Sequence, residues 1–162
     1  MAALIEIGVP ALRWSLGLLS LPHGLNKVYY DLPGFQKTAS AQITKMVPGI
    51  PQQAAEGLAT CGAGLQTAGA LAICADLFTG PLSAASVVFY GVASAQVLSQ
   101  DGANALFWME EKSSSTHNPG GFRSVEHLRF GPALYMAGYA LLFAHCSFKK
   151  PPETTEAVDH MR

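Results

Sequence analysis

The chain has 162 residues and a formal net charge of -1 at pH 7; 13% of its residues are charged and 49% are hydrophobic. This length fits one domain, and the charged share is about half of what is usual for soluble domains. Without a basic stripe to neutralise phosphates, the composition argues against nucleic acid as a partner. Three cysteines without CxxC spacing predict packing residues and no metal site.

The stretch Leu12–Tyr30 (LRWSLGLLSLPHGLNKVYY) is long and apolar enough to cross a membrane. It nevertheless carries Arg13, His23 and Lys27. Ionisable groups inside such a helix are expensive, so each needs a partner or a purpose. We therefore predict a first spanning helix over residues 11–30 and expect the rest of the chain to supply those partners.

The next segment, Asp31–Ile50, is bounded by the breakers Pro33-Gly34 and Pro48-Gly49. Between them apolar residues recur at helical spacing, which predicts a short helix lying on the membrane surface. An ordered loop is the alternative interpretation.

Two further spanning helices are predicted over residues 52–76 and 82–100, where nearly all side chains are small or apolar. Small residues four apart let helix backbones approach closely in lipid. The residues expected at helix contacts are Thr60, Gly64, Ala68, Ala72, Gly91 and Ala95.

A fourth helix is predicted over residues 125–148, either bent at Pro132 or starting there, and a polar tail follows over 149–162. Spanning segments with short connections indicate an all-α fold: a transmembrane four-helix up-down-up-down bundle over residues 1–148. The short interfacial helix would lie between its first two helices.

Alternating helix direction sorts the polar residues onto two membrane sides. We call side B the side on which the first helix ends, and side A the opposite side. Two ion pairs are then expected, Arg13 with Asp76 on side A and Lys27 with Glu56 on side B.

Pro22 removes a backbone hydrogen bond, so a kink is expected beside His23. A polar pocket on side B would then be open to a quinone or a phospholipid headgroup. Its predicted lining consists of His23, Lys27, Glu56, Trp108, His127 and Arg129. In the alternative interpretation Lys27 extends to the interface and His23 bonds a backbone carbonyl. A haem between His23 and His127 is a weaker hypothesis, and we predict no covalently bound cofactor and no catalytic residue.

The first helix resembles that of the DoxX family of small membrane proteins, which begins with an arginine and ends in HG-x-x-K. The similarity continues with Gly34-Phe35 and with Gly49-Ile50-Pro51 before a glycine-rich second helix, and covers about residues 10–145. It implies that Arg13, His23 and Lys27 are the counterparts of the family's polar first-helix positions. The family includes a subunit associated with thiosulfate:quinone oxidoreductase activity.

These observations predict an accessory, structural subunit of a larger energy-transducing complex of the respiratory electron-transfer type. It would pack against other membrane subunits and lipids in the mitochondrial inner membrane or another energy-transducing membrane, with the bacterial plasma membrane as the alternative. The competing hypothesis is a quinone-linked oxidoreductase component that uses His23 and Lys27.

Overall fold

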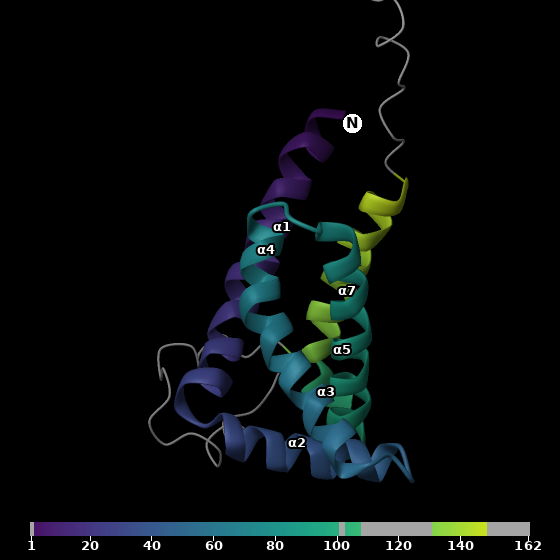
Figure 1. Cartoon of the computed structure of the whole chain (residues 1–162). Coiled ribbons are helices and arrows are strands. Elements are labelled where there is room, and N and C mark those ends of the chain that lie inside the picture. Colours follow the sequence, from purple (N-terminus) through teal and green to yellow (C-terminus); the bar gives the residue numbers. More distant parts are fainter. Residues whose placement is uncertain (1, 101–102, 108–130, 149–162) are drawn as a thin grey trace, which may run out of the picture.

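A computed structural model describes residues 2–100, 103–107 and 131–148, and every element in these ranges is helical (Figure 1). The elements are α1 (Ala2–Leu25), η1 (Asn26–Tyr30), α2 (Leu32–Met46), α3 (Gln52–Gly64), η2 (Leu65–Gly69), α4 (Ala70–Cys74), α5 (Thr79–Gln100), η3 (Ala103–Leu106) and α7 (Pro132–Phe148). The turns η1 and η2 are π-helical, and η3 is a 3-10 turn. The all-α prediction is confirmed for the described residues.

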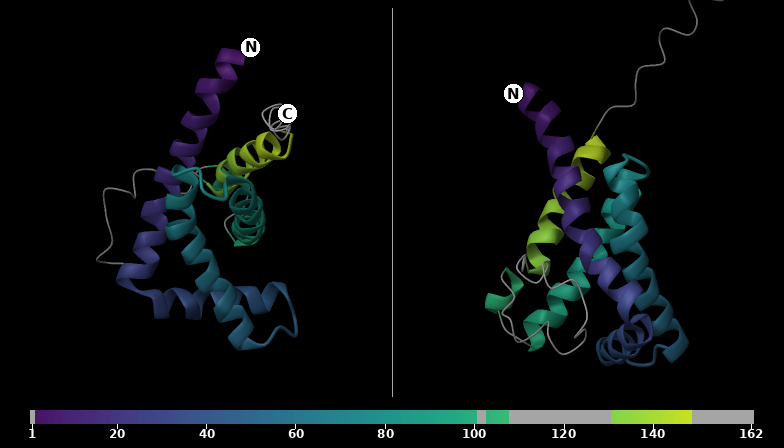
Figure 2. Two further views of the ribbon diagram at one scale, coloured as in Figure 1. Left: turned by 45° about the horizontal axis from the view of Figure 1, so that its top comes forward. Right: turned by 90° about the vertical axis from the view of Figure 1, so that its left-hand side faces the viewer.

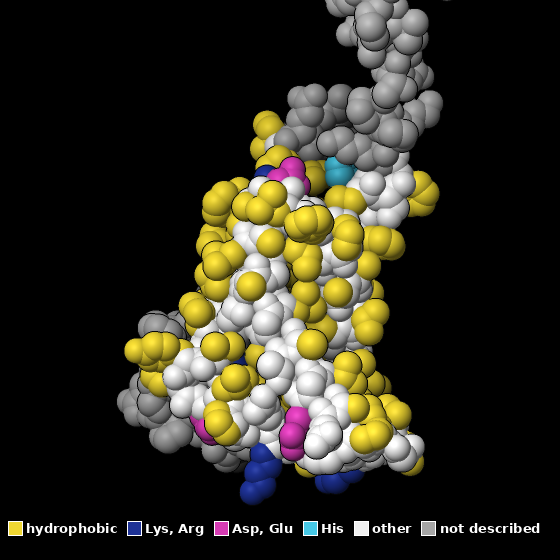
Figure 3. Space-filling model, in the orientation of Figure 1, with side chains coloured by type: hydrophobic (Ala, Val, Ile, Leu, Met, Phe, Trp, Pro, Cys, Tyr) yellow, Lys and Arg dark blue, Asp and Glu magenta, His cyan; other side chains and the backbone are white. Residues whose placement is uncertain are grey.

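Two helices in these ranges are long and apolar enough to cross a membrane, Gln52–Cys74 and Thr79–Ser99. On the face shown in Figure 3, hydrophobic side chains are spread along the helices between charged groups near the two ends. Among the most exposed are Leu58, Leu71, Val88, Leu98 and Leu141. Monomeric soluble proteins rarely expose apolar surface on this scale, whereas lipid solvates it.

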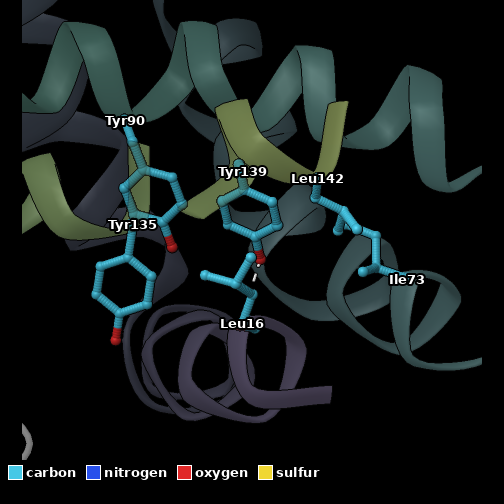
Figure 4. Close-up of a cluster of buried hydrophobic side chains, with 6 residues drawn as sticks. All are labelled: Leu16, Ile73, Tyr90, Tyr135, Tyr139 and Leu142. Carbon is cyan, nitrogen blue, oxygen red and sulfur yellow. Dashed lines mark hydrogen bonds between the residues drawn. The ribbon is translucent and has the colours of Figure 1, made fainter. Parts of the chain in front are cut away.

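The long helices form two packed pairs (Figures 1 and 2). Helix α1 packs along η2 and α4, and α5 packs along α7. Helix α2 lies across the foot of the molecule against α3. The interior between these pairs contains the buried cluster of Leu16, Ile73, Tyr90, Tyr135, Tyr139 and Leu142 (Figure 4).

The helix ends differ from the predicted ones. The first helix begins at Ala2 instead of residue 11, so Pro10 lies inside it, although proline is favoured in the first turn of a helix. The second ends at Cys74 because Asp76 and Phe78 adopt positive φ values of 60° and 53°. Helix α7 begins at Pro132, while 125–130 and the tail 149–162 lie outside the described residues.

The helix predicted between the first two long helices is present as α2. Asp31 caps its start by accepting a hydrogen bond from the backbone N–H of Gly34 at 2.9 Å, and Pro33 stands in its first turn, where a missing N–H costs nothing. On its inner side the Gln36 amide donates to the Thr60 hydroxyl of α3 at 2.7 Å. A second bond runs from Gln52 to Ser40 at 2.9 Å. These bonds hold α2 against α3.

Two glycines let α1 approach the second helix closely. A Cβ atom added at Gly17 would lie 2.8 Å from the Ala70 carbonyl oxygen, and one added at Gly24 would lie 2.6 Å from that of Gln66. Any larger residue would therefore push the two backbones apart. This contact follows the small-residue logic of membrane helices, but on a face that was not predicted.

The predicted packing stripe lies mostly outside. Thr60, Ala68 and Ala95 are exposed, Ala72 is half-buried, and a Cβ added at Gly64 would meet nothing within 4 Å. Gly91 does lie close to another helix, since its added Cβ would contact the Met136 sulfur at 3.6 Å. The alanines and glycines buried on the second helix are Ala55, Ala59, Gly62, Ala63, Gly69 and Ala70. Small residues occupy several faces of this helix, so their spacing alone does not select the buried one.

Replacing Gly24 with alanine is expected to destabilise the protein, because the new methyl group would overlap the Gln66 backbone. Overpacking of this kind costs about 1–3 kcal/mol. Thermal unfolding of the purified protein in lipid nanodiscs measures the effect. Gly57→Ala is the matched control, since its Cβ would meet nothing within 4 Å, and it should be neutral or stabilise by up to about 1 kcal/mol. Equal unfolding temperatures for the two variants would contradict the close contact.

Candidate functional site

The interior contains a continuous chain of hydrogen bonds that joins α1, η1, η2, α5 and α7. The Lys27 ammonium donates to the side-chain oxygen of Gln66, and the Gln66 amide donates to the Tyr90 hydroxyl at 3.1 Å. The Ser20 hydroxyl lies 3.1 Å from that of Tyr90 and 2.9 Å from that of Tyr139. Apart from Lys27, which is half-buried, each of these side chains is buried.

The direction of every bond in this chain follows from its two ends. At one end Lys27 can only donate. At the other end the Tyr139 hydroxyl donates to the Leu16 carbonyl oxygen at 3.3 Å, so Ser20 must donate to Tyr139 and Tyr90 must donate to Ser20. All donors then point away from the ammonium. Bonds aligned in this way polarise and strengthen one another, so the chain spreads the charge of Lys27 over neutral groups.

The tyrosines that enter this chain are held by stacking. The ring of Tyr90 stacks on that of Tyr135 at 4.9 Å between centroids and on that of Tyr139 at 5.7 Å, with interplanar angles of 9° and 13° (Figure 4). Tyr135 and Tyr139 are four apart on α7 and so share one face of that helix. The Tyr135 hydroxyl donates to the Leu19 carbonyl at 3.3 Å. Stacking and hydrogen bonding together fix α5 against α7 and α1.

Lys27 and Gln66 both belong to π-helical turns, η1 and η2. Such turns often occur at functional sites. Pro22 and Gly24 precede η1; proline lacks the N–H that would stabilise the helix, and glycine weakens it. Gly24 of α1 lies against the Gln66 backbone in η2, and Lys27 of η1 reaches the Gln66 side chain from there.

Neutral groups surround the Lys27 ammonium. Besides Gln66, it lies 4.9 Å from the centroid of the Phe35 ring and 5.7 Å from that of Phe89. Within the described ranges it forms no ion pair with a carboxylate. Aromatic faces attract a cation electrostatically, so the site stabilises a positive charge without cancelling it.

This cation lies deep in the bundle. Gln66 and Tyr90 each fall near the middle of one of the two apolar spans, Gln52–Cys74 and Thr79–Ser99. Because Lys27 is bonded to Gln66, its ammonium lies near the middle of the molecule. In the structure the Lys27 side chain turns inwards, towards an amide oxygen and two ring faces, and does not extend outwards as in the alternative interpretation.

The predicted pair of Lys27 with Glu56 does not form. Glu56 instead accepts a hydrogen bond from Gln52 at 2.9 Å. The reason is the level at which α1 crosses the second helix, since Glu56 lies about 15 Å before Gln66 along that helix at 1.5 Å per residue. Alternating helix direction gave the side of each residue but not this depth.

The other expected pair, at the opposite end of the molecule, is present. The Arg13 guanidinium lies 2.6 Å from the Asp76 carboxylate. The second oxygen of Asp76 accepts a bond from the Thr79 hydroxyl at 2.8 Å, at the start of α5. Arg13 thus ties α1 to the turn between α4 and α5.

His23, the remaining predicted residue of the first helix, lies beside the tyrosine stack. Its ring meets that of Tyr135 edge-on at 6.0 Å and 87°. Trp108, His127 and Arg129 lie outside the described residues, and so does the haem pair of His23 with His127. In the described part of the chain no group of three or more His, Cys, Asp or Glu side chains could hold a metal ion.

Four members of the hydrogen-bond chain were not predicted from the sequence: Ser20, Gln66, Tyr90 and Tyr139. One signal could have found Gln66: it is the most polar residue in an otherwise small and apolar stretch between Glu56 and Asp76. A polar side chain in such a segment faces the bundle interior and bonds another helix. Ser20 had no such signal, because serine is common on every helix face.

Apolar helices of spanning length, a hydrophobic exterior and a polar interior define this chain as an integral membrane protein. Residues 8–99 match the DoxX family model, more than half of the chain, and the protein belongs to the DoxX family. The resemblance found in the first helix is thereby confirmed. No curated protein and no solved structure matched the chain.

The variants Lys27→Met and Gln66→Leu test the hydrogen-bond chain. Each single change leaves one buried partner unsatisfied, at a cost of about 1–3 kcal/mol. The double variant should lose less than the sum of the two, with a coupling energy of about 1–2 kcal/mol. Unfolding of all four proteins in nanodiscs gives this coupling. Lys37→Met, on the exposed side of α2, should change stability little, and strict additivity of the two interior variants would refute the bond.

Proposed function

We propose that this protein is a non-catalytic accessory subunit of a larger energy-transducing membrane complex of the respiratory electron-transfer type. In this proposal α1, α3–α4, α5 and α7 cross the membrane in alternating directions, and α2 lies along the surface on side B. The observation that carries the proposal is the hydrogen-bond chain. It links interior polar groups of different helices, from the Lys27 ammonium to the Leu16 carbonyl. Its polar groups hold the helices together.

The exterior supports an accessory role. Ala68 and Ala95 are small and exposed, so helices of another subunit can approach these faces closely. Exposed large apolar side chains such as Leu58 and Leu71 on the same helix provide area for lipid or for a partner. The membrane we propose is the mitochondrial inner membrane or another energy-transducing membrane, with the bacterial plasma membrane as the alternative.

Gentle extraction tests this proposal. A tagged version of the chain, solubilised in digitonin, should migrate on a native gel with a complex that shows in-gel redox activity. Mass spectrometry should find it there at a constant ratio to the subunits that carry the redox centres. The proposal would be contradicted if the protein were recovered as a monodisperse monomer while the intact redox complex did not contain it.

A quinone-linked oxidoreductase component is the second candidate. The observation that favours it is the Lys27 ammonium, which is deeply placed and forms no ion pair within the described residues, with His23 on the same helix face. Both side chains carry N–H groups that suit the carbonyl oxygens of a quinone. The DoxX family's association with thiosulfate:quinone oxidoreductase activity points in the same direction.

His23→Ala is the sharper variant for this second candidate, because His23 lies outside the hydrogen-bond chain and its loss should leave the fold intact. If a quinone binds here, His23→Ala and Lys27→Ala should abolish quinol-linked turnover of the purified complex, while Lys45→Ala on α2 should not. Assembly is followed on the same native gel. Unchanged turnover in an assembled His23→Ala complex would remove the quinone hypothesis.

A further inference from the structure

Helix α5 presents a face of hydroxyl groups to the interior. Thr79, Ser83, Ser86 and Tyr90 are spaced so that they fall on one side of the helix, and they are only 7%, 0%, 2% and 5% exposed. Serine and threonine are common at helix contacts in membrane bundles, but a hydroxyl buried there needs a hydrogen-bond partner. The face runs from the start of α5 to its middle.

Ser83 in this face has no hydrogen-bond partner among the described residues, although its side chain is fully buried. Other hydroxyls of the same helix behave differently: Ser94 donates to the Tyr90 carbonyl and Ser99 to the Gln96 carbonyl, each at 2.7 Å. The Ser83 hydroxyl therefore donates no hydrogen bond to a backbone carbonyl of its own helix. Buried polar groups are nearly always bonded, and water is the common partner where protein offers none.

Polar groups continue the hydroxyl face at both of its ends. On side A, Thr79 bonds Asp76, and Asp76 pairs with Arg13; Nε of Arg13 is another buried polar atom without a partner among the described residues. At mid-depth, Tyr90 joins the chain that leads through Gln66 to Lys27. Ser83 and Ser86 are the two hydroxyl positions between these ends.

Apolar side chains border the same interior. Leu16, Ile73 and Leu142 are buried with the tyrosines in one cluster (Figure 4). The hydroxyl face, which ends at Tyr90, therefore borders apolar side chains.

We propose that this face of α5 is a water-lined access path from the side A surface to the mid-membrane network that ends at Lys27. Its ligand is water, held by the Ser83 and Ser86 hydroxyls between Asp76–Arg13 and Tyr90. Protons exchange along it as each hydroxyl or water accepts one proton and releases another, so no group changes its net charge. The path serves side A alone, and it rests on the membrane crossing proposed above.

Cysteine accessibility in proteoliposomes tests the path. In a background with Cys61, Cys74 and Cys146 replaced by alanine, Ser83→Cys and Ser86→Cys are treated with a small, charged, membrane-impermeant methanethiosulfonate from either side. Val88→Cys is the matched control, since Val88 lies on the same helix but is 68% exposed on the outer face. Because only hydrated thiolates react, both path variants should be modified from side A at least about tenfold faster than Val88→Cys.

The outcomes separate the path from the crossing. The path would be overturned if Ser83→Cys and Ser86→Cys were modified no faster than Val88→Cys, or if they were modified faster from side B than from side A. Either result would leave the proposed membrane crossing intact. Rapid modification of Val88→Cys would show that α5 is not surrounded by lipid, and the crossing itself would fail.

A second variant keeps the path testable if the cysteine variants do not fold. Ser83→Ala removes the hydroxyl with almost no change in volume. If Ser83 binds water, the loss of that bond should lower the unfolding temperature in nanodiscs. If the hydroxyl is dry and unpartnered, its removal should raise the unfolding temperature, and that result would overturn the proposal. Ser94→Ala, whose hydroxyl bonds its own backbone, provides the reference.

Discussion

The structure depends on how the Lys27 ammonium is held in the middle of an apolar bundle. A charge at this depth is expensive unless other groups stabilise it, and within the described residues no carboxylate does so. The charge is instead stabilised by a directed chain of hydrogen bonds and by two aromatic faces. Every long helix contributes a member or a contact to this arrangement, so the packing of all of them is linked to one side chain.

The helix geometry around the chain is adapted to the same requirement. Gly24 lets the α1 backbone approach that of Gln66 closely. This close approach lets the Lys27 side chain reach the Gln66 amide oxygen. Lys27 and Gln66 belong to the π turns η1 and η2 on either side of that contact in the chain of hydrogen bonds. At the far end Arg13 and Asp76 join the same two helices across the turn before α5. The α1 pairing is therefore fixed at two levels, one charged and one polar.

The distribution of polar groups separates an inside from an outside. Hydroxyls of α5 and the tyrosines of α7 lie inside, whereas large apolar and small residues cover the outside. In water this arrangement would be costly on both counts; in lipid it is stable. The DoxX family assignment and the membrane character thus follow from separate observations, the sequence of residues 8–99 and the physical chemistry of the surface.

The sequence alone determined the helical class, the presence of α2 and the partners Arg13 and Asp76. Apolar runs of spanning length leave no other secondary structure in a membrane. Alternating helix direction placed Arg13 and Asp76 on side A, where the structure pairs them. Breakers such as Pro33 set helix ends through local sterics. These features depend on neighbours in the chain or on the side of the membrane, both of which the sequence shows.

Only the tertiary structure decided which faces and which depths meet. Small residues occupy several sides of the second helix, so the buried alanines could not be told from the exposed stripe of Thr60 and Ala68. Likewise the sequence placed Lys27 and Glu56 on one side, but the crossing at Gly24 brings Gln66 to Lys27 instead. Periodicity specifies position around a helix axis; contact between helices also requires a crossing level, which backbone approach and side-chain packing set together.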